Sequence, residues 1–450
     1  MRRPSPGGGL AAAALFSALA GAAQLPASQD ELTPVVNPPA KSLEIDWPAL
    51  RIGIAEYAEG PTGVTVFHFP RRALAVVDVR GGGPGTVNTD YLRLGYETPE
   101  LDAVVFSGGS WYGLESTTAV ATALKDDGIR NGNWDNIALS VGAIVYDLGG
   151  RRFNEIQPDK RLAQAAYRGA RPGIFPLGAH GAGRNVRTGS LLGCNAYSGQ
   201  GGAFRQVGEL KLAAFAVVNA LGVVTTRDGR VAACYPDAGW PRELRASELV
   251  SRHADAAAQD AGRRNTTISL VVTNRKLKFA ELQRLAVQVH TSMGRAIQPF
   301  ATEFDGDVLY AVSTGELEQN PEDSIATVDL GVLASEVMWD AVLSSVPEQP
   351  SVPKRSGAAP RGDVVRSYAG DYVFSPFVTI SVSANGDLLF AQATGQRNAH
   401  AIGRERAVEL QALSARDFTV PGRYPLVLTF DGTGTLTVNP GPWQQVGRRQ

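Results

Sequence analysis

Cysteine and histidine are scarce in this chain, and their scarcity limits the chemistry available to it. Two cysteines, Cys194 and Cys234, and five histidines occur among 450 residues. The histidines have no paired spacing and form no Cys/His cluster, so we expect neither a metal site nor any other cofactor. In an oxidising compartment the two cysteines could form one disulfide. Two buried free thiols fit the sequence equally well, because spacing alone does not bring Cα atoms within bonding reach.

The chain also lacks an excess of charge of either sign. Lysine plus arginine, 43, almost cancels aspartate plus glutamate, 44. No broad basic field exists that would bind nucleic acid. A hydrophobic content of 44% is typical of a globular protein, and 450 residues are enough for two or more domains.

Long apolar runs are missing except near the first residues. There, two arginines precede a short apolar stretch over 10–23, which contains the Ala-x-Ala pattern Ala20-Gly21-Ala22. These features are typical of a secretory signal peptide, here residues 1–23, and the stretch is short for a membrane span. No cysteine lies near the cleavage region to carry a lipid anchor. We therefore expect a periplasmic or secreted protein that does not enter a membrane.

Runs typical of strands alternate with amphipathic helical runs between about residues 50 and 346. The predicted strands are 63–68, 73–79, 103–106, 137–146, 213–224, 267–272 and 308–313. The predicted helices are 114–127, 159–168, 246–262, 278–297 and 329–345. This mixture predicts a layered α/β domain.

The composition changes at residue 346. Residues 346–362 contain four prolines with small and charged residues and no apolar periodicity, which indicates a linker. Residues 363–450 then read as a small all-β domain, with hairpin turns at Asn385-Gly386 and Asp431-Gly432. This tail contains no constellation of reactive side chains, so we interpret it as an accessory or packing module.

The tripeptide Asn265-Thr266-Thr267 stands before an apolar, β-branched run. If the bond before Thr266 is cut, the new α-amine, with a pKa near ~8, can act as the base for the hydroxyl of the same residue. That is the chemistry of a self-processing amidohydrolase. Taken alone, the tripeptide also fits a turn followed by two good strand formers, or a glycosylation sequon.

Four glycine-rich patches punctuate the first domain: 80–86, 107–114, 178–183 and 199–202. No phosphate-binding loop motif and no acidic ribose-binding partner accompanies them, so nucleotide binding is disfavoured. Glycine here would let the backbone approach a ligand or another strand closely. Within the second patch, Ser110 does not fit Gly-x-Ser-x-Gly, because one residue too many separates it from Gly113, and no histidine is an obvious base.

Polar residues near apolar runs supply further candidates. Asp305 and Asp307 come two apart before a predicted strand, where they could position an ammonium group and a hydroxyl or simply form a solvated turn. Asn219 lies in a strongly apolar strand. A buried asparagine must be hydrogen-bonded; it could donate to an oxyanion or make a structural bond to backbone.

Over residues 51–316 the chain resembles the P1 family of peptidases and amidases. This family includes L-aminopeptidase/D-esterases, β-peptidyl aminopeptidases and 6-aminohexanoate oligomer hydrolases. Eight stretches carry the resemblance in one order: TGVTV from 62, VDVRGGGPGT from 77, SGGSWYGL from 107, GAG from 181, VVNALG from 217, NTTISLVVTN from 265, FDGD from 304 and STGE from 313.

The resemblance implies a layered αββα hydrolase domain over about 45–345 and an inactive precursor. The precursor would cut itself between Asn265 and Thr266 into α and β chains. Thr266 would be the nucleophile and its α-amine the base. Asn219 would stabilise the oxyanion, and Asp305 and Asp307 would orient the amine and hydroxyl. The substrate would be a small peptide or an aminoalkanoyl oligoamide, with Tyr146, Ser110 and Trp111 lining its site. Because related proteins are tetramers, the resemblance also implies a homo-oligomer, a tetramer.

One departure from the family pattern concerns an active-site lysine. Where relatives commonly have GAGTGA followed by lysine, this chain has GAGRNVRTGS from 181, and Arg184 and Arg187 are the candidates to replace the charge. Arginine and lysine differ in geometry and in acid–base use. A family-derived binding protein without catalysis is therefore the alternative. The tail from Tyr368 resembles the small β domain that follows some β-lactamase-like proteins, and the choice between exo and endo action stays open.

Overall fold

The computed structural model describes residues 29–96, 99–234, 243–255, 265–319, 326–420, 422 and 425–450. The predicted signal peptide over 1–23 lies outside the described residues, as do residues 256–262 of a predicted helix. Among the described helices, none is both long and apolar enough to cross a membrane.

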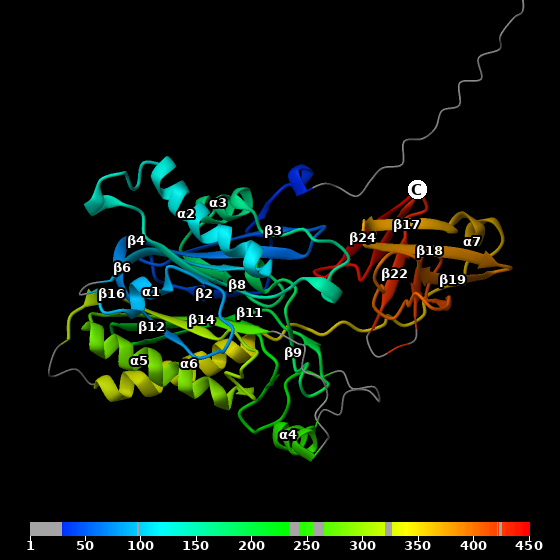
Figure 1. Ribbon diagram of the computed structural model, residues 1–450. Coiled ribbons are helices and arrows are strands. Elements are labelled where there is room, and N and C mark those ends of the chain that lie inside the picture. Colours follow the sequence, from blue (N-terminus) through cyan, green and yellow to red (C-terminus); the bar gives the residue numbers. More distant parts are fainter. Residues whose placement is uncertain are drawn as a thin grey trace, which may run out of the picture.

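A ten-stranded sheet folded into two layers forms the centre of the first domain (Figure 1). One layer has the strand order β11 (Gln200–Val207), β12 (Leu210–Asn219), β14 (Thr266–Arg275), β16 (Val308–Leu317) and β4 (Thr62–Val79). The other layer continues from β4 through β6 (Glu100–Ser107), β7 (Ser140–Ile144) and β5 (Thr86–Val87), with β3 (Arg51–Tyr57) and β1 (Val35–Val36) on the other side of β4.

The long strand β4 joins the two layers. Its first half pairs with β3 and β6, and its second half pairs with β16. The register with β6 shifts between His68 and Ala73, and such an irregularity lets a strand bend. The two strands predicted at 63–68 and 73–79 are therefore one strand.

Helices cover both outer faces of this sandwich, which gives the expected αββα layering (Figure 1). α2 (Glu115–Asp126) and α3 (Lys160–Arg168) cover one layer, and α5 (Phe279–Ser292) and α6 (Thr327–Ser344) cover the other. The alternation of side chains in β12 explains the arrangement. Phe215 and Val217 face the core between the sheets, whereas Ala216 and Val218 face the core beneath α5 and α6.

Smaller elements complete the first domain. They are α1 (Thr89–Arg93), α4 (Ala246–Asp255), and the two-stranded pairs β2 (Ser42–Ile45) with β8 (Gly173–Pro176), β9 (Arg187–Thr188) with β10 (Ala196–Tyr197), and β13 (Val223–Val224) with β15 (Ile297–Gln298). The strand predicted at 213–224 is thus divided, and β12 ends at Asn219. Cys194 and Cys234 form a disulfide, which decides between the two alternatives that the sequence left open.

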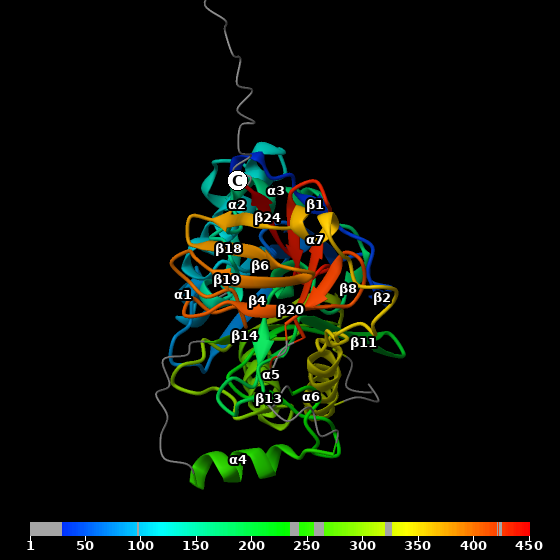
Figure 2. The same ribbon diagram turned by 90° about the vertical axis from the view of Figure 1, so that its right-hand side faces the viewer.

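A closed eight-stranded barrel follows the first domain and faces the viewer in Figure 2. Residues 346–362, all of which are described, contain no helix or strand, and the short helix α7 (Asp363–Ser367) leads into the barrel. Its strands are β17 (Gly370–Ser375), β18 (Val378–Asn385), β19 (Leu388–Ala393), β20 (Val408–Ala412), β21 (Asp417–Thr419), β22 (Val427–Phe430), β23 (Thr435–Val438) and β24 (Gln445–Arg449). Closure removes the exposed sheet edges that an open β domain would have.

Candidate active site

The ends of three neighbouring strands bring the predicted site residues together. Thr266 is the first residue of β14 and pairs directly with Asn219, the last residue of β12. Asn265 forms a parallel bridge with Asp305, just before β16. Residues far apart in the sequence therefore meet at the ends of these strands, because β12, β14 and β16 are adjacent in the sheet.

The carbonyl group between Asn265 and Thr266 is held by two donors. The Thr266 hydroxyl donates to the Asn265 carbonyl oxygen at 2.5 Å, and the Gly306 N–H donates to the same oxygen at 2.9 Å. A side chain at Gly306 would place its Cβ 2.7 Å from both the Thr266 Oγ1 and the Gly83 carbonyl oxygen. Glycine at 306 thus leaves room for the Thr266 hydroxyl beside a carbonyl oxygen that accepts two hydrogen bonds.

Asp305 and Asp307 are buried and bonded to backbone around Thr266. Asp307 accepts from the Thr267 N–H at 2.6 Å and from the Ala301 N–H at 3.0 Å. Asp305 accepts from the Leu221 N–H at 3.2 Å. The solvated-turn interpretation is therefore wrong. Burial raises the pKa of both carboxyl groups, and the charge of Asp305 raises the pKa of Asp307 further.

This raised pKa predicts a pH-dependent stability of the uncut chain. A carboxyl group whose pKa is higher in the folded state stabilises the fold below its unfolded pKa, about 4, and this contribution is lost as pH rises through the folded pKa. We expect the free energy of unfolding of Thr266→Ala, relative to Thr266→Ala/Asp307→Asn, to fall as pH rises from about 4 toward neutral. Urea unfolding of both variants across this range measures the difference, in which the titrating groups that do not interact with Asp307 cancel. A difference that stays constant or grows with pH would contradict it.

Asn219 is fully buried beside Thr266, and both ends of its amide are engaged. Its Oδ1 accepts from Arg151 Nη1 at 2.5 Å and from the Arg187 N–H at 3.2 Å. Its Nδ2 donates to the Tyr146 carbonyl oxygen at 3.2 Å. Because an amide nitrogen carries two hydrogens, one N–H of Asn219 is used by this bond.

A pocket of about 1080 Å³ opens at the Asn265–Thr266 bond. The predicted substrate-site residues Tyr146, Ser110 and Trp111 all line it, and Trp111 is 72% exposed. The other lining residues are Gly82, Gly83, Pro84, Ile144, Leu148, Gly150, Arg151, Arg187, Ser190, Asn195, Asn265, Thr266, Glu303 and Phe304. The pocket is thus walled by aromatic rings, two guanidinium groups and one carboxylate.

The two arginines predicted to replace the charge of the family's active-site lysine lie in different environments. Arg187 lines the pocket, and its guanidinium lies 4.8 Å from the centre of the Tyr197 ring. Arg184 instead forms a buried ion pair with Glu56 and donates to the Pro442 carbonyl oxygen at 3.2 Å. Of the two, only Arg187 is placed to act on a substrate.

The glycine-rich patch 80–86 packs against the loop that carries the two aspartates. The Gly83 N–H donates to the Asp305 carbonyl oxygen at 2.9 Å, and the Gly81 N–H donates to that of Asp307 at 3.1 Å. A Cβ on Gly81 would lie 2.1 Å from the Asp307 nitrogen. The close backbone approach expected of these glycines is therefore made to another segment of the same chain.

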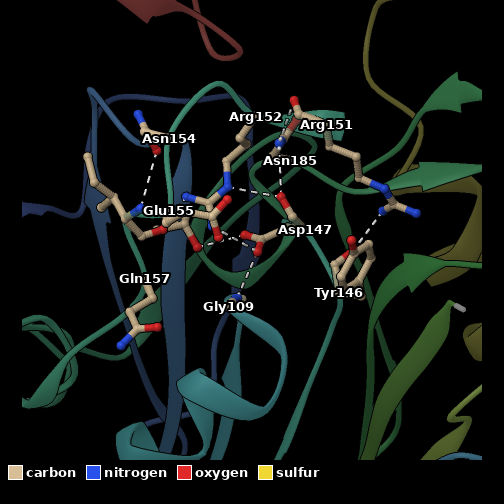
Figure 3. Close-up of polar contacts among 12 residues, drawn as sticks. Gly109, Tyr146, Asp147, Arg151, Arg152, Asn154, Glu155, Gln157 and Asn185 are labelled. Carbon is tan, nitrogen blue, oxygen red and sulfur yellow. Dashed lines mark hydrogen bonds and ion pairs between the residues drawn. The ribbon is translucent and has the colours of Figure 1, made fainter. Parts of the chain in front are cut away.

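Sequence reasoning missed Arg151, which joins two of the predicted residues. Arg151 Nη2 donates to Asn265 Oδ1 at 2.6 Å, and Nη1 donates to Asn219 Oδ1. Nη1 also donates to the Tyr146 carbonyl oxygen at 2.8 Å (Figure 3). No motif distinguishes this arginine from the other basic residues of the chain. Its position after a predicted strand, between two glycines and a second arginine, was the one available signal.

Sequence comparisons identify relatives that match between 63% and 70% of this chain. A 6-aminohexanoate-oligomer endohydrolase of Paenarthrobacter ureafaciens is 38% identical over 324 residues, which cover 70% of this chain and 89% of that protein. A protein of the same name from Kocuria is 37% identical over 324 residues, with the same coverage. An uncharacterised aminopeptidase of Mycobacterium tuberculosis is 29% identical over 308 residues, covering 63% of this chain and 85% of that protein.

Among solved structures, a Burkholderia β-aminopeptidase matches with a TM-score of 0.48 and 19% identity, covering 67% of this chain and 84% of that one. The L-aminopeptidase D-Ala-esterase/amidase of Ochrobactrum anthropi matches with a TM-score of 0.45 and 16% identity, covering 66% and 82%. The profile of peptidase family S58 matches residues 45–359. The resemblance found in the sequence is confirmed: the chain belongs to peptidase family S58 and is a hydrolase that acts on amide bonds.

Proposed function

We propose that the chain cuts its own Asn265–Thr266 bond and then hydrolyses amide bonds of peptide-like or aminoalkanoyl oligomers through Thr266. The observation that carries this proposal is the Asn265 carbonyl group in the pocket wall, which accepts from both the Thr266 hydroxyl and the Gly306 N–H. The second donor stands where negative charge develops when a carbonyl carbon is attacked.

Self-cleavage would begin with attack of Thr266 Oγ1 on the Asn265 carbonyl carbon. The C–N bond breaks, an ester links Asn265 to the Thr266 oxygen, and the nitrogen of residue 266 gains a proton to become a free amine. Water then hydrolyses the ester, leaving the Asn265 carboxylate and the Thr266 hydroxyl. The buried Asp305 and Asp307 would supply negative charge close to the new ammonium group.

Substrate hydrolysis would reuse the same residues. The Thr266 α-amine takes the hydroxyl proton as the oxygen attacks the substrate carbonyl carbon, and it passes this proton to the leaving amine. The amine product departs, and water activated by the same α-amine hydrolyses the ester. Asn219 and Arg151 hold each other beside the reacting carbon, and the remaining N–H of Asn219 is the proposed oxyanion donor.

The pocket lining favours a linear oligoamide that passes through the site. Trp111, Tyr146 and Phe304 offer aromatic surface for methylene groups. The guanidinium groups of Arg151 and Arg187 outnumber the one acidic side chain of the lining, Glu303. An exo-acting aminopeptidase would need negative charge to hold the substrate ammonium group. We therefore propose endo action, the activity named for the relatives with 38% identity.

Denaturing electrophoresis, N-terminal sequencing and an amide assay test this function together. We expect two fragments, the second starting at Thr266, and hydrolysis of 6-aminohexanoate oligomers whether or not their terminal amine is acetylated. A chain that stays whole would overturn the Thr266 mechanism, and cleavage restricted to free amines would overturn endo action. Family membership disfavours the alternative of a non-catalytic binding protein. Export and assembly into a homo-oligomer stay predictions.

A further inference from the structure

The C-terminal barrel contains a side chain from the first domain in its core. Phe153 is buried and packs with the barrel residues Phe374 and His400, with ring centres 5.1 and 4.8 Å apart. Among the described residues, it is the one member of this core cluster that precedes residue 363. The barrel is therefore built around a residue of the catalytic domain.

Polar contacts fasten the backbone on both sides of this ring. The Phe153 N–H donates to Gln445 Oε1 at 3.0 Å, and the Ser375 hydroxyl donates to the Phe153 carbonyl oxygen. Two residues on, Glu155 forms an ion pair with Arg397 of the barrel. Gln445 is almost fully buried, so its bond to Phe153 is shielded from water.

This fastened segment carries Arg151, two residues before Phe153. Between them Arg152 is fully buried, and it donates to the Asp147 carbonyl oxygen at 2.9 Å and pairs with the Asp147 carboxylate at 3.3 Å (Figure 3). The backbone that follows Arg151 is thus fastened twice, by Arg152 to Asp147 and by Phe153 to the barrel. The guanidinium of Arg151 is thereby held against Asn219 and Asn265.

A second contact reaches the other guanidinium of the pocket. Trp443 of the barrel stacks on Tyr197, with ring centres 4.1 Å apart. Tyr197 in turn accepts a hydrogen bond from Arg187 at 3.2 Å and lies under its guanidinium. Both pocket arginines are therefore supported by barrel residues, through separate contacts.

We propose that the C-terminal barrel is part of the catalytic framework: Gln445 and Trp443 are positioning residues that act through Arg151 and Arg187. This inference rests on the proposed function of the same site and replaces our interpretation of the tail as a mere accessory module. The 6-aminohexanoate-oligomer endohydrolase of Paenarthrobacter ureafaciens aligns with 70% of this chain. The barrel dependence is thus inferred from this chain's own contacts.

Three leucine variants of the full chain test the proposal. Gln445→Leu removes the acceptor for the Phe153 N–H, and Trp443→Leu removes the stack on Tyr197. Gln392→Leu is the control, because it removes another glutamine amide of the barrel, one whose bond to the Arg404 carbonyl oxygen stays within the barrel. We expect kcat for oligoamide hydrolysis to fall about tenfold in the first two variants, through misplacement of catalytic groups, and to stay unchanged in the control.

A double-mutant cycle separates positioning from general destabilisation. On the Arg151→Met background, Gln445→Leu should cause no further loss in kcat, because the group through which it acts is gone. An equal loss on both backgrounds, or no loss in Gln445→Leu and Trp443→Leu on the natural background, would overturn the proposal.

Hydrogen–deuterium exchange provides a second test of the proposal that does not depend on activity. Peptides covering 149–156 should exchange faster in Gln445→Leu than in the unchanged protein or in Gln392→Leu. If the unchanged protein neither cuts itself nor hydrolyses amides, the proposed function fails. The exchange rates of these peptides then decide alone whether the barrel positions the segment that carries Arg151. Equal protection in all three proteins would then refute it.

Discussion

Thr266→Ala should yield a folded, single chain that neither cuts itself nor hydrolyses oligoamides. The residue supplies the attacking oxygen in both reactions, and after cleavage its nitrogen supplies the base. Loss of such a nucleophile costs at least about 10⁴-fold in rate. Mass spectrometry of the purified chain and a single-turnover amide assay measure the two losses.

Two further variants at this position distinguish loss of the hydroxyl from misfolding. Thr266→Val keeps the β-branched shape that suits the first residue of β14 and should be as inactive as Thr266→Ala. Thr266→Ser keeps the hydroxyl and should retain processing at a reduced rate. Processing in Thr266→Val would show that another group attacks the bond.

Asn219→Ala should lower kcat by roughly 10²-fold or more, the effect of removing one oxyanion donor. The variant also leaves Arg151 without its acceptor at 2.5 Å. The loss in Asn219→Ala alone would therefore mix the missing donor with a misplaced guanidinium. Steady-state kinetics on a 6-aminohexanoate oligomer, after confirming processing by electrophoresis, measures the combined loss.

Asn219→Asp separates the two contributions. It keeps an oxygen for Arg151 and for the Arg187 N–H but removes both amide hydrogens. If the amide donor is what matters, Asn219→Asp should be about as slow as Asn219→Ala. Activity near that of the unchanged protein would instead assign to Asn219 a purely structural role, in which it holds Arg151.

The sequence predicted which segments contribute residues to the site better than it predicted the contacts among those residues. Thr266, Asn219 and Asp305 could be located because each stands at the end of an apolar strand, where polar residues are conspicuous. Adjacent strands then bring such ends together. Arg151 could not be found in this way. It lies in a turn after β7, and the segment that follows this turn is bonded through Phe153 to Gln445, almost three hundred residues later.

The same distinction holds for the fold. Local periodicity and turn residues predicted the helices α2 to α6 and the strands β4, β6, β7, β12, β14 and β16, because those signals lie within a few residues of each other. They did not predict β3 or β11. The continuity of β4 was not predicted, since its exposed middle, Pro70 to Arg72, reads as a break between two strands. The pairing of Cys194 with Cys234 and the closure of the barrel likewise depend on contacts between distant residues.

The strand order of the sheet implies that the two chains, once cut and denatured, cannot refold as a single molecule. β14 and β16 would belong to the second chain, yet they lie between β12 and β4 of the first. The two chains would be interleaved through one hydrogen-bonded sheet and would part only if the whole domain unfolds. The disulfide lies entirely within the first chain and would not tether them. Once denatured, the mature enzyme would have to reassemble from two separate molecules, at a rate that depends on concentration.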